Sequence, residues 1–473
     1  MSDRLTTRAL PELHPSLILV DSGAVQDGAF EDRGVWTTDG GGVTIGTTLV
    51  TVHWDELLTA VTSIVATGDD ATVRRAQCLG AALHALERED DILALRLLYE
   101  RHCGEESRWA HHISLLPNRL PHCLLHWTAD ELLGLAGCSI ETTARAWRAQ
   151  VGMDYGDLCA TSFELDGETK TIGSTFGAKW LSSETYVWAL SMIWSRFVSV
   201  QREDVVYKSM APTFDLFNHT SDARETHAFD PTADVLRLVT LGTIDGTWQS
   251  GGAPPRAWGA SEEVCINYGL GNAKLLLHHG FIESAAAVNP RDAVPITLGL
   301  ASGMPQWELK RDLLAASSFE IASAECGAVQ IEMSAADPIP PLLIAMLRLR
   351  RAEDASPAAL TAALEGDATW TALGAAVEIA ALDDLHAAIA PMLARLAMDA
   401  RVVDEEDSED DESSEEEEGD DAGRAQRADD RDKRGMMATR LRELETAILL
   451  GVTAEIARMR GLVDAEEGLD AMD

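Results

Sequence analysis

Two short segments near the middle of the chain carry the side chains best suited to chemistry. They are residues 215–219, with the sequence DLFNH, and residues 263–269, with the sequence EVCINYG. An Asn-His pair near a strand-borne tyrosine can form a small polar pocket inside apolar walls. Such a pocket suits the transfer of a methyl group from a sulfonium compound to an amine.

Amine methylation makes few demands on acid–base residues. The amine must be neutral to attack, although free lysine has a pKa of about 10.4. A narrow, dry site lowers that pKa, and in-line alignment then carries the reaction. Weak C–H···O contacts and a tyrosine hydroxyl, for which Tyr268 is suited, can align the methyl group. Asn218 and His219 suit cofactor binding through the Asn amide and nearby backbone groups, although each motif alone also fits an ordinary turn or strand end.

The elements that must position these residues alternate along the chain. Residues 34–52 have the pattern of a β-hairpin, and residues 54–200 have helical spacing with a capping box beginning at Thr128. Strand patterns return at 235–241 and 264–268. A β region that is interrupted by a long helical stretch and then resumed predicts an inserted domain. After residue 283 the chain is rich in Ala and Leu and reads as almost purely helical.

In combination, these motifs resemble the SET-domain protein methyltransferases of the Rubisco large-subunit methyltransferase branch. Residues 212–219 follow that branch's P-x-x-D-x-x-N-H pattern, and residues 263–281 follow its E-x-V-x-I-x-Y-G and N-A-x-L-L-L patterns. Upstream, residues 31–37, 100–117 and 195–196 match its cofactor segment, tryptophan-containing insert and Ser-Arg helix end. The resemblance covers about residues 30–283.

The resemblance implies an α+β fold: a SET β-fold of small sheets with a knot-like C-terminal part, a helical insert and an all-α substrate-binding domain. The expected limits are 1–30 for an N-terminal extension, 31–283 for the SET domain and 284–473 for the helical domain. The insert is expected at about 60–190.

The resemblance also implies S-adenosyl-L-methionine as the cofactor and Tyr268 as the catalytic residue. Arg196 is expected to contact the cofactor's carboxylate, for which a bidentate guanidinium is suited. Asp215 is expected either to contact the cofactor or to order the loop beneath it. The expected cofactor-binding residues are Glu31, Arg33, Arg196, Asp215, Asn218, His219 and Tyr268.

Three positions form the expected substrate pocket, and two of them depart from the family pattern. His279 and Phe229 stand where the family has tyrosines, and His279 also fits a packed core histidine. Val198 stands where a histidine-methylating relative has asparagine, which favours a lysine target. The implied function is therefore a protein-lysine N-methyltransferase. The alternatives are a protein-histidine methyltransferase on the same fold and a non-catalytic acidic docking module, and no metal is expected.

The net charge of the chain limits the kinds of molecule that it can bind. The net charge is −40, and residues 404–421 hold 14 acidic side chains without a basic one. This charge repels phosphate backbones and attracts basic proteins, which excludes nucleic acid and favours a basic protein substrate. Residues 404–432 are expected to form a disordered acidic loop, either a spacer or a binder of basic proteins, with a last helix from Met437.

The remaining composition bears on compartment. No apolar run reaches 18 residues, so no membrane span is expected, and the first residues lack the apolar core of a secretory signal. The seven cysteines include no C-x-x-C pair, which favours reduced thiols. We expect a cytoplasmic or nuclear protein, with a plastid location left open by Arg4 and Arg8. The oligomeric state stays open.

Overall fold

The structure is a computed structural model. The residues that it describes are 6–8, 13–21, 33–38, 43, 46–61, 70–177, 179–223, 225–240, 258–283, 289–319, 321, 327–364, 373–398 and 421–470. The expectations for Glu31 and for the acidic residues 404–420 therefore lie outside the described residues. Within the described part of the chain, no helix is long and apolar enough to cross a membrane.

Three small antiparallel sheets form the N-terminal β region, in the orders β1-β2-β3, β10-β11-β4 and β5-β9-β8. Their strands are β1 (Thr6–Arg8), β2 (Leu17–Asp21), β3 (Arg33–Thr37), β4 (Thr48–His53), β5 (Leu58–Thr59), β8 (Phe197–Arg202), β9 (Val205–Met210), β10 (Glu225–Asp230) and β11 (Val235–Thr240). Inward-facing apolar side chains from these strands form one core, to which Val35, Leu49 and Leu238 belong.

The predicted hairpin over residues 34–52 is wrong in its pairing. β3 pairs with β2, and β4 pairs with β11 across almost 190 residues, with Val52 opposite Leu236. Alternation identified the strands correctly, but their partners depend on which distant apolar face completes the core. Residues 264–268, expected as a strand, form only isolated bridges. They lie between β3 and residues 218–220, because Val264 donates to Val35 O and Ile266 donates to Asn218 O, each at 2.7 Å.

A helical insert separates β5 from β8. It contains α1 (Asp70–His84), α2 (Glu89–Cys103), α3 (Ala110–Leu115), α4 (Ala129–Leu133), α5 (Glu141–Ala160), the hairpin β6–β7 (Ser162–Leu165 and Glu168–Thr171), α6 (Ile172–Phe176) and α7 (Ser183–Arg196). The predicted capping box is confirmed, because Thr128 Oγ1 accepts from Glu131 N and Glu131 Oε2 accepts from Thr128 N. α7 ends at Arg196 and continues directly into β8.

The C-terminal region was expected to be all-α. It is mostly helical but also contains a pair of strands. Its elements are α8 (Asn272–His279), β12 (Ala293–Leu298), α9 (Trp307–Ala316), β13 (Val329–Ser334), α10 (Pro341–Arg351), α11 (Pro357–Leu364), α12 (Ala375–Ala397) and α13 (Asp421–Asp470). β12 and β13 pair antiparallel, and their alternating apolar residues face the same core as the surrounding helices. That alternation is the pattern of a half-buried strand, which the Ala- and Leu-rich surroundings obscured.

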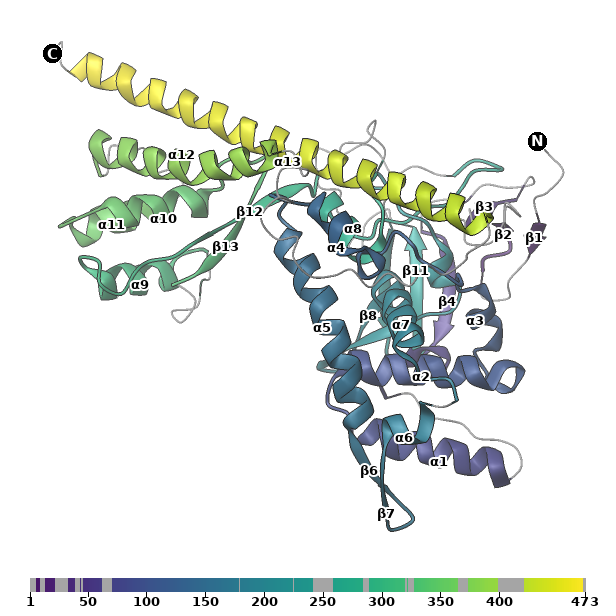
Figure 1. Cartoon of the computed structure of the whole chain (residues 1–473). Coiled ribbons are helices and arrows are strands. Elements are labelled where there is room, and N and C mark those ends of the chain that lie inside the picture. The colour runs from purple at the N-terminus through teal and green to yellow at the C-terminus, as the bar shows by residue number, and fades with distance from the viewer. Residues whose placement is uncertain are drawn as a thin grey trace.

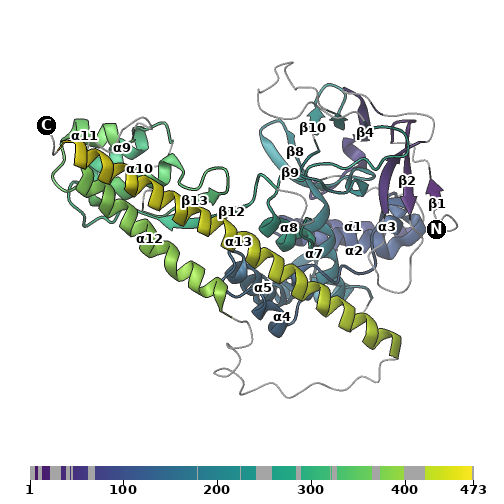
Figure 2. The same ribbon diagram turned by 90° about the horizontal axis from the view of Figure 1, so that it is seen from above.

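Helix α13 begins at Asp421, whereas the acidic loop was expected to extend to residue 432 and the helix to begin at Met437. Some of the charges near the start of this helix are paired, which lowers the repulsion that predicted disorder. Asp429 and Lys433 lie one turn apart with a 2.8 Å ion pair, and Arg434 Nη1 contacts Glu131 Oε2 at 2.5 Å. α13 runs from the insert past α8 and along α12, so it spans both parts of the molecule (Figure 1, Figure 2).

Candidate active site

A cavity of about 320 Å³ lies where the end of α7, strand β8, residues 266–270 and the end of α8 meet. A short 3₁₀ turn, η4 (Phe214–Leu216), closes one side. Most of its wall is apolar, with polar groups at a few points. The lining residues include Phe197, Val198, Phe214, Phe217, Leu238 and Ile266 among the apolar ones, and Ser195, Arg196, Ser199, Asp215, His227, Asn267, Tyr268, His278 and His279 among the polar ones. Such a site can hold a ligand in a largely dry environment with a few fixed polar contacts.

Tyr268 lines this cavity as expected. Its hydroxyl donates a hydrogen bond of 2.8 Å to Phe217 O, and its ring lies 4.6 Å from that of His279. Burial raises the pKa of Tyr268 well above its ordinary value, so the hydroxyl keeps its proton. Because that proton is directed at a carbonyl, the oxygen lone pairs remain available to accept weak hydrogen bonds from a ligand.

Arg196 and Asp215 meet at the cavity wall. Arg196 Nη1 donates to the backbone O of Asp215 at 2.9 Å and lies 3.7 Å from its carboxylate, whose side chain is 1% exposed. His112 Nδ1 lies at the same 3.7 Å from the other carboxylate oxygen. Arg196 Nε and both carboxylate oxygens are buried without a hydrogen-bond partner in the described part of the chain. Unsatisfied buried polar atoms are costly, so these groups suit a polar ligand that would satisfy them.

A second polar group lies across β3. Asn218 Nδ2 donates to the backbone O of Arg33 at 2.8 Å and to Glu263 Oε1 at 2.7 Å. A Cβ at Gly34 would lie 2.4 Å from Glu263 Oε1, so the glycine is what lets this pair pack against the strand. The Arg33 side chain turns away and donates to Leu115 O. The structure therefore brings Arg33, Asn218 and Glu263 together, although neither Arg33 nor Asn218 belongs to the cavity lining.

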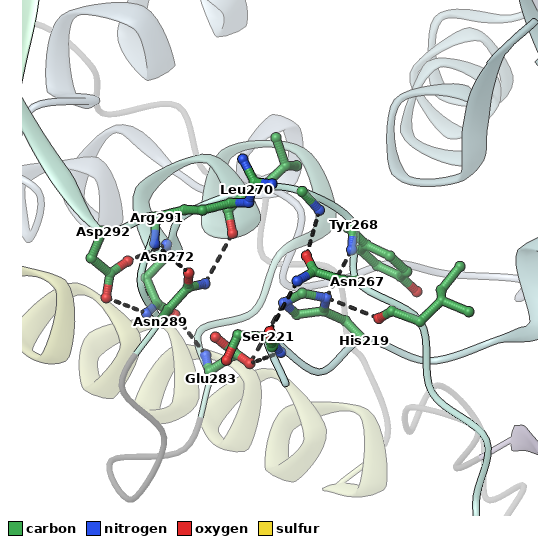
Figure 3. A network of polar contacts seen from close by, with 12 residues as sticks. His219, Ser221, Asn267, Tyr268, Leu270, Asn272, Glu283, Asn289, Arg291 and Asp292 are labelled. Atoms are coloured by element: carbon green, nitrogen blue, oxygen red, sulfur yellow. Dashed lines mark hydrogen bonds and ion pairs between the residues drawn. The ribbon is translucent and has the colours of Figure 1, made fainter. Parts of the chain in front are cut away.

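His219 supports Tyr268 from behind. Its imidazole, 1% exposed, does not line the cavity, and its Nδ1 accepts the backbone N–H of Tyr268 at 3.0 Å (Figure 3). Burial lowers the pKa of His219 although Glu283 lies close to the ring, so the neutral form is favoured. The expected role of His219 in cofactor binding, through backbone groups near it, stays a prediction.

Of the expected substrate-pocket residues, Val198 and His279 line the cavity and Phe229 does not. Phe229 packs edge-on against Trp54, with ring centroids 5.7 Å apart. His227 lines the cavity instead, two residues earlier on β10 and thus on the same side of the strand. Burial and the neighbouring histidines lower the pKa of His279 to about 3.

Sequence reasoning missed His227, Asn267 and Glu283. His227 shares the period of two with Phe229, which could have identified it. Asn267 precedes Tyr-Gly and caps its own turn, since its Oδ1 accepts from Gly269 N at 2.7 Å, a recognisable Asx signal. Glu283 had no local signal. Within the described residues, no group of His, Cys, Asp and Glu could hold a metal ion.

Small antiparallel sheets interrupted by a helical insert, with a cavity at their junction and long C-terminal helices, define the SET-type α+β fold, as expected. In particular, the chain shares the fold of Rubisco LSMT. It matches the SET domain of LSMT bound to methyllysine and AdoHcy with a TM-score of 0.61 at 18% identity, over 98% of this chain and 90% of that one. Rubisco LSMT bound to AdoMet gives 0.59 at 18% identity, over 98% and 89%. No family model and no curated protein sequence matches the chain.

Proposed function

We propose that this protein is a protein-lysine N-methyltransferase that uses S-adenosyl-L-methionine. One observation carries the proposal: the Tyr268 hydroxyl, with its proton directed at Phe217 O, faces an apolar cavity beside the unsatisfied groups of Arg196 and Asp215. The likeness to LSMT structures that contain AdoMet, AdoHcy, lysine and methyllysine supports it.

The polar groups of the site fit this cofactor, which supplies a methyl group activated by a sulfonium charge. Arg196 Nε is a free donor for a ligand carboxylate, and guanidinium groups pair well with carboxylates. Asp215 places two buried oxygens without a hydrogen-bond partner at the same wall, which can accept hydrogen bonds from a ligand. Arg33 on β3, and Asn218, which donates to its backbone, would border the cofactor, as the family resemblance implies.

The cavity favours a neutral nucleophile. The low pKa of His279 arises mainly from burial at this wall, so the environment already disfavours a cation on a resident side chain. A lysine that enters would lose its proton more readily for the same reason. Val198 presents an apolar, 5% exposed side chain rather than a hydrogen-bond acceptor for an imidazole, which favours lysine over histidine as the target.

Labelling tests the proposal directly. The protein is incubated with methyl-labelled cofactor and cell extract, beside Tyr268→Phe and the control Tyr155→Phe. Tyr155 also donates to a backbone carbonyl, Leu181 O at 3.4 Å, but lies in the insert. We expect transfer to lysine by the wild type and by Tyr155→Phe, and a loss of about 10²-fold or more in Tyr268→Phe because the methyl group is no longer aligned.

Three outcomes would contradict parts of the proposal. No label despite measurable cofactor binding would exclude the enzyme and favour a docking module. Label on imidazole would exclude the lysine assignment and favour a histidine methyltransferase. Equal transfer by Tyr268→Phe would exclude the role of the hydroxyl.

The substrate is proposed to be a protein with a basic surface, since the chain carries a net charge of −40. Deleting the acidic residues 404–420 tests whether this tract contributes. If it captures substrate, the deletion weakens substrate affinity mainly at low salt, where charge attraction is least screened. An unchanged substrate profile and salt dependence would make the tract a spacer.

A further inference from the structure

A buried polar network extends from the back of Tyr268 to the start of strand β12 (Figure 3). His219 holds the Tyr268 amide through Nδ1, and its other ring nitrogen, Nε2, lies 3.5 Å from Glu283 Oε1. The His219 and Glu283 side chains are only 1% and 7% exposed. Glu283 comes after α8, and Asn272, the first residue of α8, accepts its backbone N–H at 2.8 Å. The network therefore connects segments that are distant in the sequence.

The contacts of Nδ1 determine where the His219 ring carries its proton. The backbone N–H of Tyr268 can only donate, so Nδ1 must offer a lone pair to it. A neutral ring then carries its proton on Nε2, which faces Glu283. The competing tautomer would donate from Nδ1 to Ile266 O, 3.2 Å away, and release the Tyr268 amide. Two backbone groups thus compete for one nitrogen.

Glu283 resolves this competition by its charge. Its carboxylate accepts a proton-bearing Nε2, whereas it repels the lone pair that Nε2 would present in the competing tautomer. Within the described part of the chain, neither Nε2 nor Glu283 Oε2 has a hydrogen-bond partner, and Nε2 makes only the 3.5 Å contact with Glu283 Oε1. A buried acceptor facing a buried donor favours the tautomer in which both are satisfied.

We propose that Glu283 is a positioning residue for Tyr268: its carboxylate selects the Nε2–H tautomer of His219, and Nδ1 then anchors the Tyr268 backbone. The consequence for catalysis rests on the proposed function, because it matters only if the Tyr268 hydroxyl aligns methyl transfer. The tautomer assignment itself concerns the protein alone.

The rest of the network holds Glu283 in place. Ser221 N donates to Glu283 Oε1 at 2.8 Å. Asn272 is fixed in turn by Asp292, which accepts its backbone N–H at 2.6 Å and its side-chain N–H at 2.8 Å. The side-chain amide of Asn272 therefore links Asp292, which precedes β12, to Glu283, which faces His219. An asparagine at the start of the motif at residues 272–277 makes both contacts.

The experiment measures the His219 imidazole by nitrogen-15 NMR in selectively histidine-labelled full-length protein without cofactor, and methyl transfer in parallel. The variants are Glu283→Leu, which removes the acceptor, and Glu283→Gln, which keeps a neutral one. The matched control is Glu445→Gln, which removes another buried carboxylate that bonds Ser139 instead.

In the wild type and in Glu445→Gln, we expect the His219 proton on Nε2. In Glu283→Leu, the tautomer ratio should shift toward Nδ1–H by about tenfold or more, the effect of losing a hydrogen bond to a charged group. Glu283→Gln should shift it less. The kcat for methyl transfer should fall in the same order, about 10- to 100-fold in Glu283→Leu, with KM for the protein substrate little changed because the ring does not line the cavity.

Three results would overturn the proposal. A proton on Nδ1 in the wild type would overturn it without any variant, and so would an unshifted tautomer or an unchanged kcat in a folded Glu283→Leu protein. If the wild type transfers no methyl group at all, the proposed function fails, while the NMR result still decides the tautomer.

Discussion

A buried carboxylate on α13 should make this protein less stable as the pH rises from about 5 to 8. Glu445 is 2% exposed, and its two oxygens accept Ser139 N at 2.8 Å and Ser139 Oγ at 2.5 Å. Burial raises the pKa of Glu445 to about 7, and the nearby Asp292 contributes in the same direction. The contact joins α13 to the turn that precedes α5, so its ionisation acts on the junction between the C-terminal helices and the insert.

The size of the effect follows from the difference in pKa between the two states. The ordinary value is 4.5, so between pH 4.5 and 7 the folded state binds more protons at Glu445 than the unfolded state does. The stabilisation is complete below the unfolded pKa and is lost as the pH rises through the folded one. Each unit is worth about 1.4 kcal/mol, which gives about 3 kcal/mol in total and about 2 kcal/mol between pH 5.5 and pH 8.

Glu445→Gln isolates this effect because an amide imitates the protonated acid. Its oxygen can accept Ser139 N–H, and its nitrogen can donate to Ser139 Oγ. Urea unfolding of both proteins at pH 5.5 and pH 8 measures the free energy of unfolding of each. We expect the variant to gain about 2 kcal/mol relative to the wild type across this interval.

The control is Glu332→Gln, whose exposed side chain pairs with Lys274 at 3.1 Å and should show little dependence on pH in this range. The reasoning would be refuted if the difference in unfolding free energy between wild type and Glu445→Gln stayed constant with pH. It would also be refuted if the wild type became the more stable of the two as the pH rose.

Two further predictions concern the substitution of glycines by alanine. Gly280→Ala should lower the free energy of unfolding by at least about 2 kcal/mol, because the φ of Gly280 is +73° and a Cβ there would lie 2.6 Å from the backbone carbon of His122. Gly269→Ala should lower it by only about 1 kcal/mol, because Gly269 has a similar φ of +74° but nothing lies within 4 Å of a Cβ. Chemical unfolding compares the two, and equal costs would contradict the packing argument. Gly34→Ala should leave the fold intact but weaken S-adenosylmethionine binding about tenfold or more, because the added Cβ displaces Glu263 from its hydrogen bond with Asn218. Titration calorimetry measures the Kd. An unchanged Kd would count against a role for Asn218 in binding the cofactor.

Much of the cavity could be predicted because its residues lie in contiguous motifs. Tyr268, Arg196 and Asp215 stand at the ends of elements whose order along the chain is readable, and all three line one cavity. The capping box at Thr128 was similarly predictable, because local hydrogen bonds determine it, and the family resemblance gave the end of α7 at Arg196. The comparison with the family pattern also identified His279 as a departure from it.

Other features required the tertiary structure. The sequence marks β3 and β4 as strands, yet their partners β2 and β11 depend on which distant faces bury each other. Phe229 and His227 share a strand face, and only packing against Trp54 decides which of them reaches the cavity.

The sequence by itself determined which residue types stand in the candidate site, a tyrosine and an arginine with an Asn-His pair beside them, whose roles in catalysis and cofactor binding stay predictions. The tertiary structure alone decided that the His219 ring turns inward to Glu283 and holds the Tyr268 backbone. The physical reason is that a side chain's direction and protonation depend on the groups that burial places around it. Those groups come from segments whose separation along the chain conveys nothing about their distance in space.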